Sequence, residues 1–199
     1  MQAKRYVDRK ITIILIVINV AVFAVLEMIG DTTDGVFMAQ HGAMFVPYCI
    51  QEDRWYLLFT SMFLHFGFPH LLNNMFILFC IGEYLERFLG KIKYLILYLA
   101  AGLSGNLLSL AIEMRTGDFA VSAGASGAIF GVVGGMLWVV LRNKGKVANF
   151  SVRGMLIMLA LSLYFGFTSS GVDNWAHVGG AAGGFIFAML LYRRKSTLL

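Results

Sequence analysis

Charged residues are scarce in this sequence. Lysine, arginine, aspartate and glutamate make up 14% of its 199 residues, whereas hydrophobic residues make up 59%. Soluble domains average about 25% charged and about 45–50% apolar residues, and a soluble fold could not cover this much apolar surface. Together with a mean hydropathy of +0.76, the shortage of charge excludes an ordinary soluble domain and indicates a membrane protein.

Signals for disulfides, a cleaved leader, a second domain and a metal site are also missing. The cysteines, Cys49 and Cys80, give no disulfide framework, and Cys80 lies in an apolar run where a small core residue is expected. No A-x-A-like cleavage site follows the first apolar run, which we interpret as a retained anchor. No long linker divides the chain, so we expect a single domain over residues 1–199. The histidines lack metal-ligand spacing, and no metal or organic cofactor is indicated.

Six apolar segments are candidates for membrane-spanning helices, which require about 20 predominantly apolar residues each. The apolar stretch at residues 55–88 is too long for one span and is interrupted at residues 67–70. We expect an interfacial or re-entrant piece there, followed by a helix that starts near Pro69, because proline at a first turn loses no hydrogen bond. The expected spans are residues 11–29, 69–88, 94–113, 124–141, 151–168 and 175–192. The sequence therefore predicts an all-α membrane protein, a six-transmembrane-helix bundle with a long external loop between spans one and two.

The basic residues predict how this bundle is oriented. They fall in short runs between the apolar segments, at residues 4–10, 87–93, 142–153 and 193–195. This distribution places 14 of the 16 lysines and arginines on one side of the membrane and leaves Arg54 and Arg115 opposite. By the positive-inside rule, both termini are expected in the cytoplasm. Because the net charge of +5 is not gathered on one face, nucleic-acid binding is not expected.

Residues capable of hydrolytic chemistry recur at the outer ends of spans two, four and six. These spans run from outside to inside, so their first turns lie just below the outer surface and carry His70 and Asn74, Ser126, and His177 respectively. Polar side chains in a membrane usually face a partner, a cavity or the bundle interior. Each histidine alone is explained equally well as a hydrogen-bonding residue between helices. Four such residues at one depth predict a site.

The chemistry expected of this site is nucleophilic catalysis by a serine. A neutral imidazole that takes the serine proton turns the hydroxyl into an acyl-transfer nucleophile, so we predict a dyad of Ser126 and His177. His70 and Asn74 share one helix face and can donate hydrogen bonds to an oxyanion, helped by the N–H groups at the start of span four. No carboxylate completes a triad, because Asp173 is expected to be solvated in a short outer loop.

The spelling Gly-x-Ser-Gly occurs twice, at residues 102–105 and 124–127. Ser104 falls near the bilayer midplane with no histidine at its level, so we interpret it and its glycines as a helix-packing surface. Depth, and not the motif, therefore selects Ser126 between Gly124 and Gly127.

Small residues also predict how spans four and six approach each other. Glycines recur every four residues in both, at positions 127, 131 and 135 and at positions 180 and 184. Such rows let two helices touch, which would bring Ser126 within reach of His177. Phe130, one turn below Ser126, either stacks on the imidazole or fills the core.

Four motifs jointly resemble those of the rhomboid intramembrane serine proteases. They are HF at residues 65–66, HLLNN at 70–74, GASG at 124–127, and AHVGG at 176–180 with Gly184. Each motif is modest alone, but the combination is specific, and the resemblance extends from about residue 55 to residue 192. It implies that Ser126 is the nucleophile, that His177 is its general base, and that His70 and Asn74 line the oxyanion hole.

The resemblance also implies an activity and a location. Such a protein is a serine-type endopeptidase that cuts transmembrane segments of other proteins near the outer face, where their helices unwind easily. Without an accessory domain the chain is similar to the minimal bacterial form, so we expect a multi-pass protein of the bacterial plasma membrane. One departure concerns the external loop. The family's Trp-Arg pair, four residues before a threonine, is replaced here by Tyr56-Leu57 before Thr60, with Arg54-Trp55 slightly upstream.

Two non-catalytic functions compete with proteolysis. A rhomboid-like pseudoprotease that binds membrane clients is expected to lack Ser126 or His177, and both are present. A small transporter commonly shows internal repeats or a charged residue near the midplane. This chain has no repeat, and its glutamates in apolar segments, Glu27, Glu83 and Glu86, lie toward helix ends.

Overall fold

The computed structural model describes residues 10–169 and 171–193, and the described chain is mostly helical. The long helices are α1 (Lys10–Ile29), α5 (Gly67–Leu89), α6 (Lys91–Thr116), α7 (Ser126–Arg142), α8 (Val152–Thr168) and α9 (Asn174–Leu191). Their ends lie within three residues of the six expected segments. The segment between α1 and α5, which was expected to be an external loop, holds the short helices α2 (Gly35–Gln40), α3 (Val46–Gln51) and α4 (Leu57–Thr60), followed by the 3-10 turn η1 (Ser61–Phe63). The basic residues Lys4, Arg5, Arg9, Arg194 and Lys195 lie outside the described residues.

Several of these helices have the length and composition of membrane spans. α1, α6 and α9 are each long and apolar enough to cross a bilayer. The pair formed by α4–η1 and α5 is also long and apolar enough when taken together, but it is bent by 86° at the break before Gly67, as in a broken span or a re-entrant segment. The apolar helices α7 and α8 have 17 residues each. Because helices satisfy their own backbone groups, such a bundle is stable in lipid, and the chain is an integral membrane protein.

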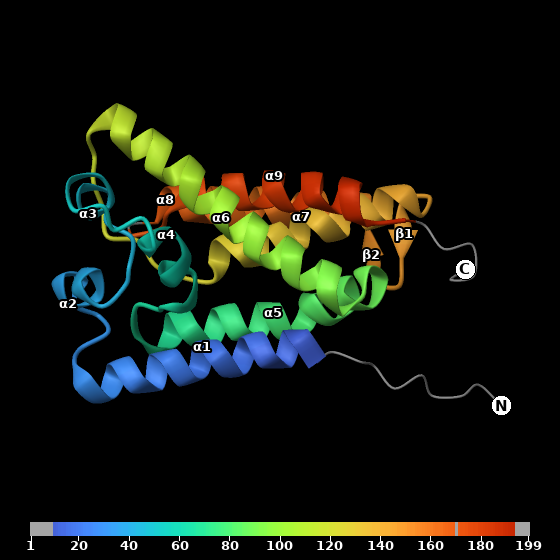
Figure 1. Cartoon of the computed structure of the whole chain (residues 1–199). Coiled ribbons are helices and arrows are strands. Elements are labelled where there is room, and N and C mark those ends of the chain that lie inside the picture. Colours follow the sequence, from blue (N-terminus) through green and yellow to red (C-terminus); the bar gives the residue numbers. More distant parts are fainter. Residues whose placement is uncertain (1–9, 170, 194–199) are drawn as a thin grey trace.

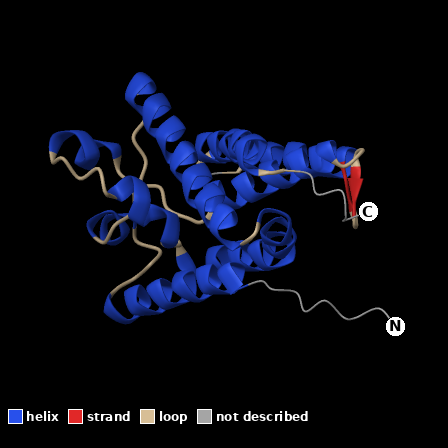
Figure 2. Cartoon of the chain, turned by 45° about the vertical axis from the view of Figure 1, so that its right-hand side comes forward, coloured by secondary structure: helices blue, strands red, loops and turns tan. Residues whose placement is uncertain are grey.

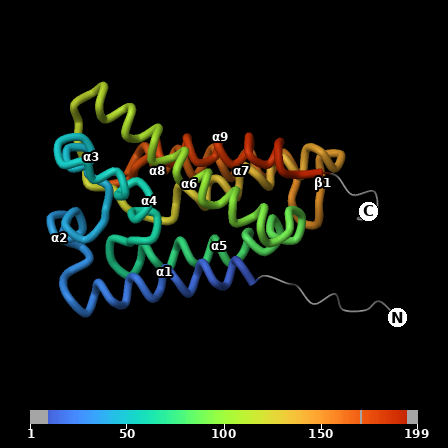
Figure 3. The backbone as a smooth tube through the Cα atoms, viewed as in Figure 1, coloured from blue at the N-terminus to red at the C-terminus, as the bar shows by residue number. Residues whose placement is uncertain are grey.

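The long helices form one bundle that α6 crosses diagonally (Figure 1). α1 lies along α5, while α9 packs against both α6 and α7. The view in Figure 2 shows the same helical bundle from another side. The short helices α2 and α3 lie at one end of the bundle, where α5, α7 and α9 begin, and the last residues of α9 lie at the opposite end (Figure 3).

A small hairpin between α7 and α8 lies at that opposite end and was not expected from the sequence. Its antiparallel strands are β1 (Lys146–Val147) and β2 (Phe150–Ser151). The ring of Phe150 packs edge-on against Tyr84 of α5, with 4.9 Å between the centroids. This contact joins the hairpin to the bundle.

Glycines bring α7 and α9 into backbone contact, as their spacing predicted. A Cβ on Gly180 would collide with the carbonyl of Gly127, and a Cβ on Gly184 would collide with the carbonyl of Gly131. The other Gly-x-Ser-Gly sequence, at residues 102–105, lies in α6 and packs closely against α9, because a Cβ on Gly105 would lie 2.5 Å from the carbonyl oxygen of Ala176. Ser104 donates its hydroxyl to the Ala100 carbonyl of its own helix (2.8 Å).

Two side chains of α5 show how its faces are used. Glu86 is 1% exposed and accepts hydrogen bonds at the start of α1, from the N–H of Ile11 (2.9 Å) and from the N–H (2.9 Å) and hydroxyl (2.7 Å) of Thr12. The first N–H groups of a helix lack intrahelical partners, so this carboxylate caps α1 and ties it to α5. The expectation that Cys80 is a core residue is wrong. Cys80 is exposed and free, because it lies opposite the buried face of α5.

Candidate active site

Ser126 is the first residue of α7, and hydrogen bonds to the segment between α1 and α5 hold the residues before it. The Gly124 N–H donates to the carbonyl of Ser61 (2.9 Å). The Ala125 N–H donates to Nε2 of His65 (3.4 Å), a fully buried side chain. These bonds fix the backbone on the approach to Ser126 and leave the N–H groups of the first turn of α7 without helical acceptors.

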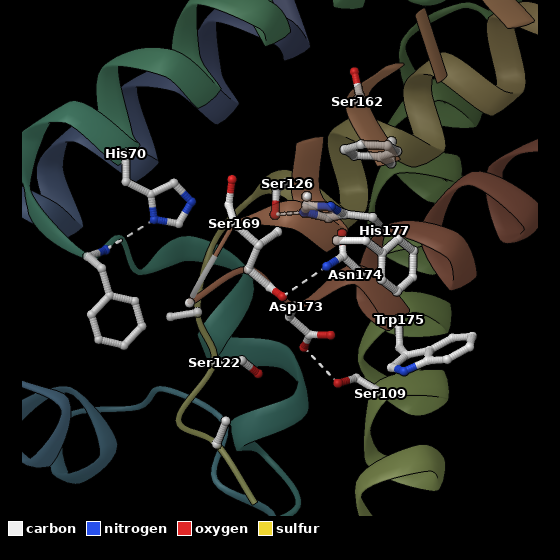
Figure 4. Close-up of a pocket in the computed structure, with 18 of the residues that line it drawn as sticks. His70, Ser109, Ser122, Ser126, Ser162, Ser169, Asp173, Asn174, Trp175 and His177 are labelled. Carbon is white, nitrogen blue, oxygen red and sulfur yellow. Dashed lines mark hydrogen bonds between the residues drawn. The ribbon is translucent and has the colours of Figure 1, made fainter. Parts of the chain in front are cut away.

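The structure places Ser126 beside His177 of α9, as Figure 4 shows. Nε2 of His177 lies 2.8 Å from Oγ of Ser126. The ring of Phe130 stacks on the imidazole, with 4.2 Å between centroids and 7° between planes. Nδ1 of His177 has no hydrogen-bond partner within the described part of the chain. In a neutral ring, Nε2 can accept the serine O–H while Nδ1 carries the proton. The pair therefore has the geometry of a nucleophile and a general base.

His70 of α5 faces Ser126 across Gly124. The Phe66 N–H donates to Nδ1 of His70 (3.4 Å), so in the neutral ring Nε2 carries the proton and can donate it. A Cβ on Gly124 would lie 3.0 Å from this Nε2 and 3.5 Å from Oγ of Ser126. The imidazole of His70 and the hydroxyl of Ser126 thus both lie close to Gly124.

Asn74, one turn after His70, is 3% exposed. Its Nδ2 is buried and has no partner among residues 10–169 and 171–193. A buried donor without an acceptor costs free energy, unless a bound group supplies the acceptor. Asn74 is therefore chemically suited to bind an oxyanion.

These side chains line a cavity of about 840 Å³. The walls come from α5, including Asn74 and Ile77, from the first turns of α7 and α9, and from Ser162 and Phe165 of α8. Within the described residues, no group of three histidine, cysteine, aspartate or glutamate side chains could hold a metal ion.

The expectation that Asp173 is merely solvated is wrong. Its carboxylate accepts the hydroxyl of Ser109 on α6 (2.7 Å) and the N–H of Ala176 on α9 (2.9 Å). Asp173 is therefore the N-cap of α9 and also joins α9 to α6 (Figure 4). The sequence carried some signal for the capping role, because an aspartate directly before a helix is a common N-cap. The partner on α6 could not be read from the sequence.

His65 and Asn106 also shape the site without having been assigned a role from the sequence. His65 stands in the HF motif, which was the available signal. Asn106 is a polar residue inside an apolar helix, a position that usually has a partner. It is 9% exposed and donates to the carbonyl of Leu58 (2.7 Å) and to Oγ of Ser61 (3.0 Å).

Comparison with known proteins adds to this geometry. Residues 52–194 match the family model of the Rhomboid domain. The chain is 34% identical over 180 residues to "Rhomboid protease GluP" of Bacillus subtilis (strain 168), which covers 90% of this chain and 34% of GluP. It is 34% identical over 146 residues to "Putative rhomboid protease YdcA" of the same organism, covering 73% of this chain and 72% of YdcA. It is 37% identical over 159 residues to "RHOMBOID-like protein 4" of Arabidopsis thaliana, covering 77% of this chain and 38% of that protein. The chain thus spans about a third of the length of GluP.

Proposed function

This chain belongs to the rhomboid family, and we propose that it is an intramembrane serine endopeptidase. The proposed nucleophile is Ser126, the proposed general base is His177, and His70 and Asn74 are the proposed oxyanion donors. The substrates would be transmembrane segments of other membrane proteins. The hydrogen bond of 2.8 Å between Oγ of Ser126 and Nε2 of His177 carries this proposal.

The proposed reaction is acyl transfer in two stages. Nε2 of His177 takes the proton of Ser126 as Oγ attacks the carbonyl carbon of the scissile peptide bond. The histidine then gives this proton to the leaving nitrogen, and the acyl-serine forms. Water attacks the acyl-serine with the same histidine as base, which releases the new carboxylate and restores Ser126. The stacked ring of Phe130 supports the imidazole in the required plane.

The negative charge that develops on the carbonyl oxygen needs donors that are already in place. Nε2–H of His70, Nδ2–H of Asn74 and the backbone N–H of Ser126 are the proposed set. The first turn of α7 adds the positive end of the helix dipole. Donors of this kind are effective because they need no reorganisation when the charge appears, and losing one typically costs about 3–4 kcal/mol in activation free energy.

We further propose that all six long helices cross the bilayer as one domain, with both chain ends on the cytoplasmic side and Ser126 near the outer face. The connection between α7 and α8 lies at the end of the bundle opposite the first turns of α7 and α9 (Figure 1), and its sequence carries Arg142, Lys144, Lys146 and Arg153, which supports this orientation. Transmembrane substrates would then be cut near the outer surface, where water reaches the site. The proposed location is the bacterial plasma membrane.

Substrates are proposed to reach the cavity between α5 and α8. Side chains of both helices line the cavity, and α8 buries only Met155 and Gly166 against the rest of the bundle. A substrate helix must unwind before its peptide bond reaches Ser126, and each backbone group freed in lipid needs a new partner. Substrates with small or helix-breaking residues near the cleavage site are therefore expected to be preferred.

The test is labelling of the purified full chain in detergent by a fluorophosphonate, together with cleavage of a transmembrane reporter. We expect covalent labelling on Ser126 in the unmutated chain, and at least a hundred-fold slower labelling in His177→Ala, since removing the base leaves an unactivated hydroxyl. Ser104→Ala, which alters the other Gly-x-Ser-Gly sequence, is the matched control and should react normally. Reporter cleavage by Ser126→Ala at the rate of the unmutated chain would contradict the proposal.

A further inference from the structure

The two members of the proposed dyad are attached to one face of α6. Ser126 follows a loop segment bound by residues of the external loop, and His177 lies on the first turn of α9. Both attachments end on α6, at Asn106 and Ser109. We propose that Asn106 and Ser109 are positioning residues that together set the separation of Ser126 and His177. This inference rests on the function proposed above.

The first attachment runs from Asn106 to the serine. Nδ2 of Asn106 donates both to the carbonyl of Leu58 (2.7 Å) and to Oγ of Ser61 (3.0 Å). The carbonyl of Ser61 in turn accepts the N–H of Gly124 (2.9 Å), two residues before Ser126. Ser61 is 2% exposed, so water cannot easily replace these bonds. Asn106 therefore holds the backbone that aims the nucleophile.

The second attachment runs from Ser109 to the histidine. Oγ of Ser109, a side chain that is 1% exposed, donates to Oδ2 of Asp173 (2.7 Å). Oδ1 of the same carboxylate accepts the N–H of Ala176 (2.9 Å), which is the residue before His177. Rotation or sliding of the first turn of α9 would break one of these bonds. Ser109 therefore holds the helix end that carries the base.

Asn106 and Ser109 are three residues apart on α6 and so share one face of that helix. The surrounding contacts keep the attachments short. A Cβ on Gly105 would lie only 2.5 Å from the carbonyl of Ala176, so α9 approaches α6 as closely as glycine allows. On the same helix, Gly102 leaves room for the side chain of Met62 in the external loop.

This arrangement attaches both members of the proposed dyad to the same helix. The loop and α9 could each shift slightly on their own, and the distance from Oγ to Nε2 would change by the sum of both shifts. With both attached within one turn of a rigid helix, the shifts are coupled to α6. A misplacement of about 1 Å can cost about a hundred-fold in rate, so precise attachment has a direct effect on the chemical step.

The experiment measures inactivation of the full chain by a fluorophosphonate, separating the maximal inactivation rate constant from the concentration at half-saturation. We expect Ser109→Ala to lower the maximal rate constant about ten-fold, as for loss of one buried hydrogen bond, with the half-saturation concentration unchanged. Asn106→Ala should act in the same way. Ser104→Ala is the matched control, because it removes a hydroxyl from the same helix, and within the described residues this hydroxyl bonds to the carbonyl of Ala100 alone.

A double variant identifies the path of the effect. If Ser109 acts through Asp173, Ser109→Ala/Asp173→Ala should react no more slowly than Asp173→Ala alone. The proposal is overturned if Ser109→Ala keeps the maximal rate constant of Ser104→Ala, or if its effect adds fully to that of Asp173→Ala. Failure of the proposed function looks different, because the unmutated chain would then not be labelled on Ser126. Should Asn106→Ala not fold, the Ser109 variants still decide the question.

Discussion

Gly124 occupies a position in which its lack of a side chain has a direct chemical consequence. Its φ is +146°, a region that residues with a Cβ rarely adopt. A Cβ would also lie 2.9 Å from Cε1 and 3.0 Å from Nε2 of His70. The glycine therefore allows the backbone before Ser126 to turn and leaves the ring of His70 next to the proposed nucleophile.

We expect Gly124→Ala to slow labelling and cleavage about a hundred-fold, because the methyl group displaces His70 or rotates the backbone that carries Ser126. The matched control is Gly117→Ala. Gly117 also has a positive φ (+78°), but a Cβ at this position would meet no atom within 4 Å. Rate constants and thermal midpoints of both variants check the prediction. Equal losses of activity in the two variants would show that backbone strain alone, and not the contact with His70, is responsible.

Among the long helices, α8 buries the fewest of its residues. Met155 near one end and Gly166 near the other are its buried residues. A Cβ on Gly166 would overlap Oδ1 of Asn174, a buried side chain at the start of α9. Much of the rest of α8 carries exposed apolar side chains, including Leu161, Tyr164 and Phe165. The C-terminal end of α8 is therefore held by this close approach together with the contact between the rings of Phe167 and Trp175, whose centroids lie 6.1 Å apart.

We expect Gly166→Ala to move the C-terminal end of α8 away from α9 and to widen the access between α5 and α8. Cleavage of a transmembrane reporter should rise several-fold, whereas labelling by a small fluorophosphonate, which needs no wide access, should stay unchanged. The thermal midpoint should fall, because the contact with Asn174 is lost. Gly35→Ala is the control, since a Cβ on this helical glycine of α2 would meet no atom within 4 Å. A Gly166→Ala variant with unchanged reporter cleavage would count against access along α8.

At the scale of the whole molecule, hydropathy predicted the helices well and their faces poorly. In a membrane, both the core side and the lipid side of a helix are apolar, so no amphipathic period separates them. That is why Cys80, which is exposed, was expected in the core. Long-range polar pairs were equally hidden. Glu86 binds the start of α1, and Asp173 binds Ser109, but each pair depends on how distant helices are placed side by side.

The proposed site was more accessible to sequence reasoning than those pairs, for a physical reason. Once the basic residues orient the spans, depth in the bilayer is a coordinate that the sequence supplies, and it grouped His70, Asn74, Ser126 and His177. The sequence does not show which helices lie side by side within the membrane plane. The attachments of the site to α6, through Asn106 and Ser109, depend on which helices are neighbours, so they could not be predicted.

The six-span topology can be tested at its weakest point, which is the pair α7 and α8. A helix of 17 residues is about 26 Å long, slightly shorter than a hydrocarbon core of about 30 Å. Local thinning of the bilayer accommodates such a mismatch at modest cost. We expect a cysteine at Lys146, in the hairpin between them, to react with an impermeant maleimide only from the cytoplasmic side, and one at Asp118 only from the outside. Cys49→Ala and Cys80→Ala remove the background. If α7 and α8 instead formed a re-entrant pair, Lys146→Cys would be protected or would react from the same side as Asp118→Cys, and the six-span proposal would be wrong.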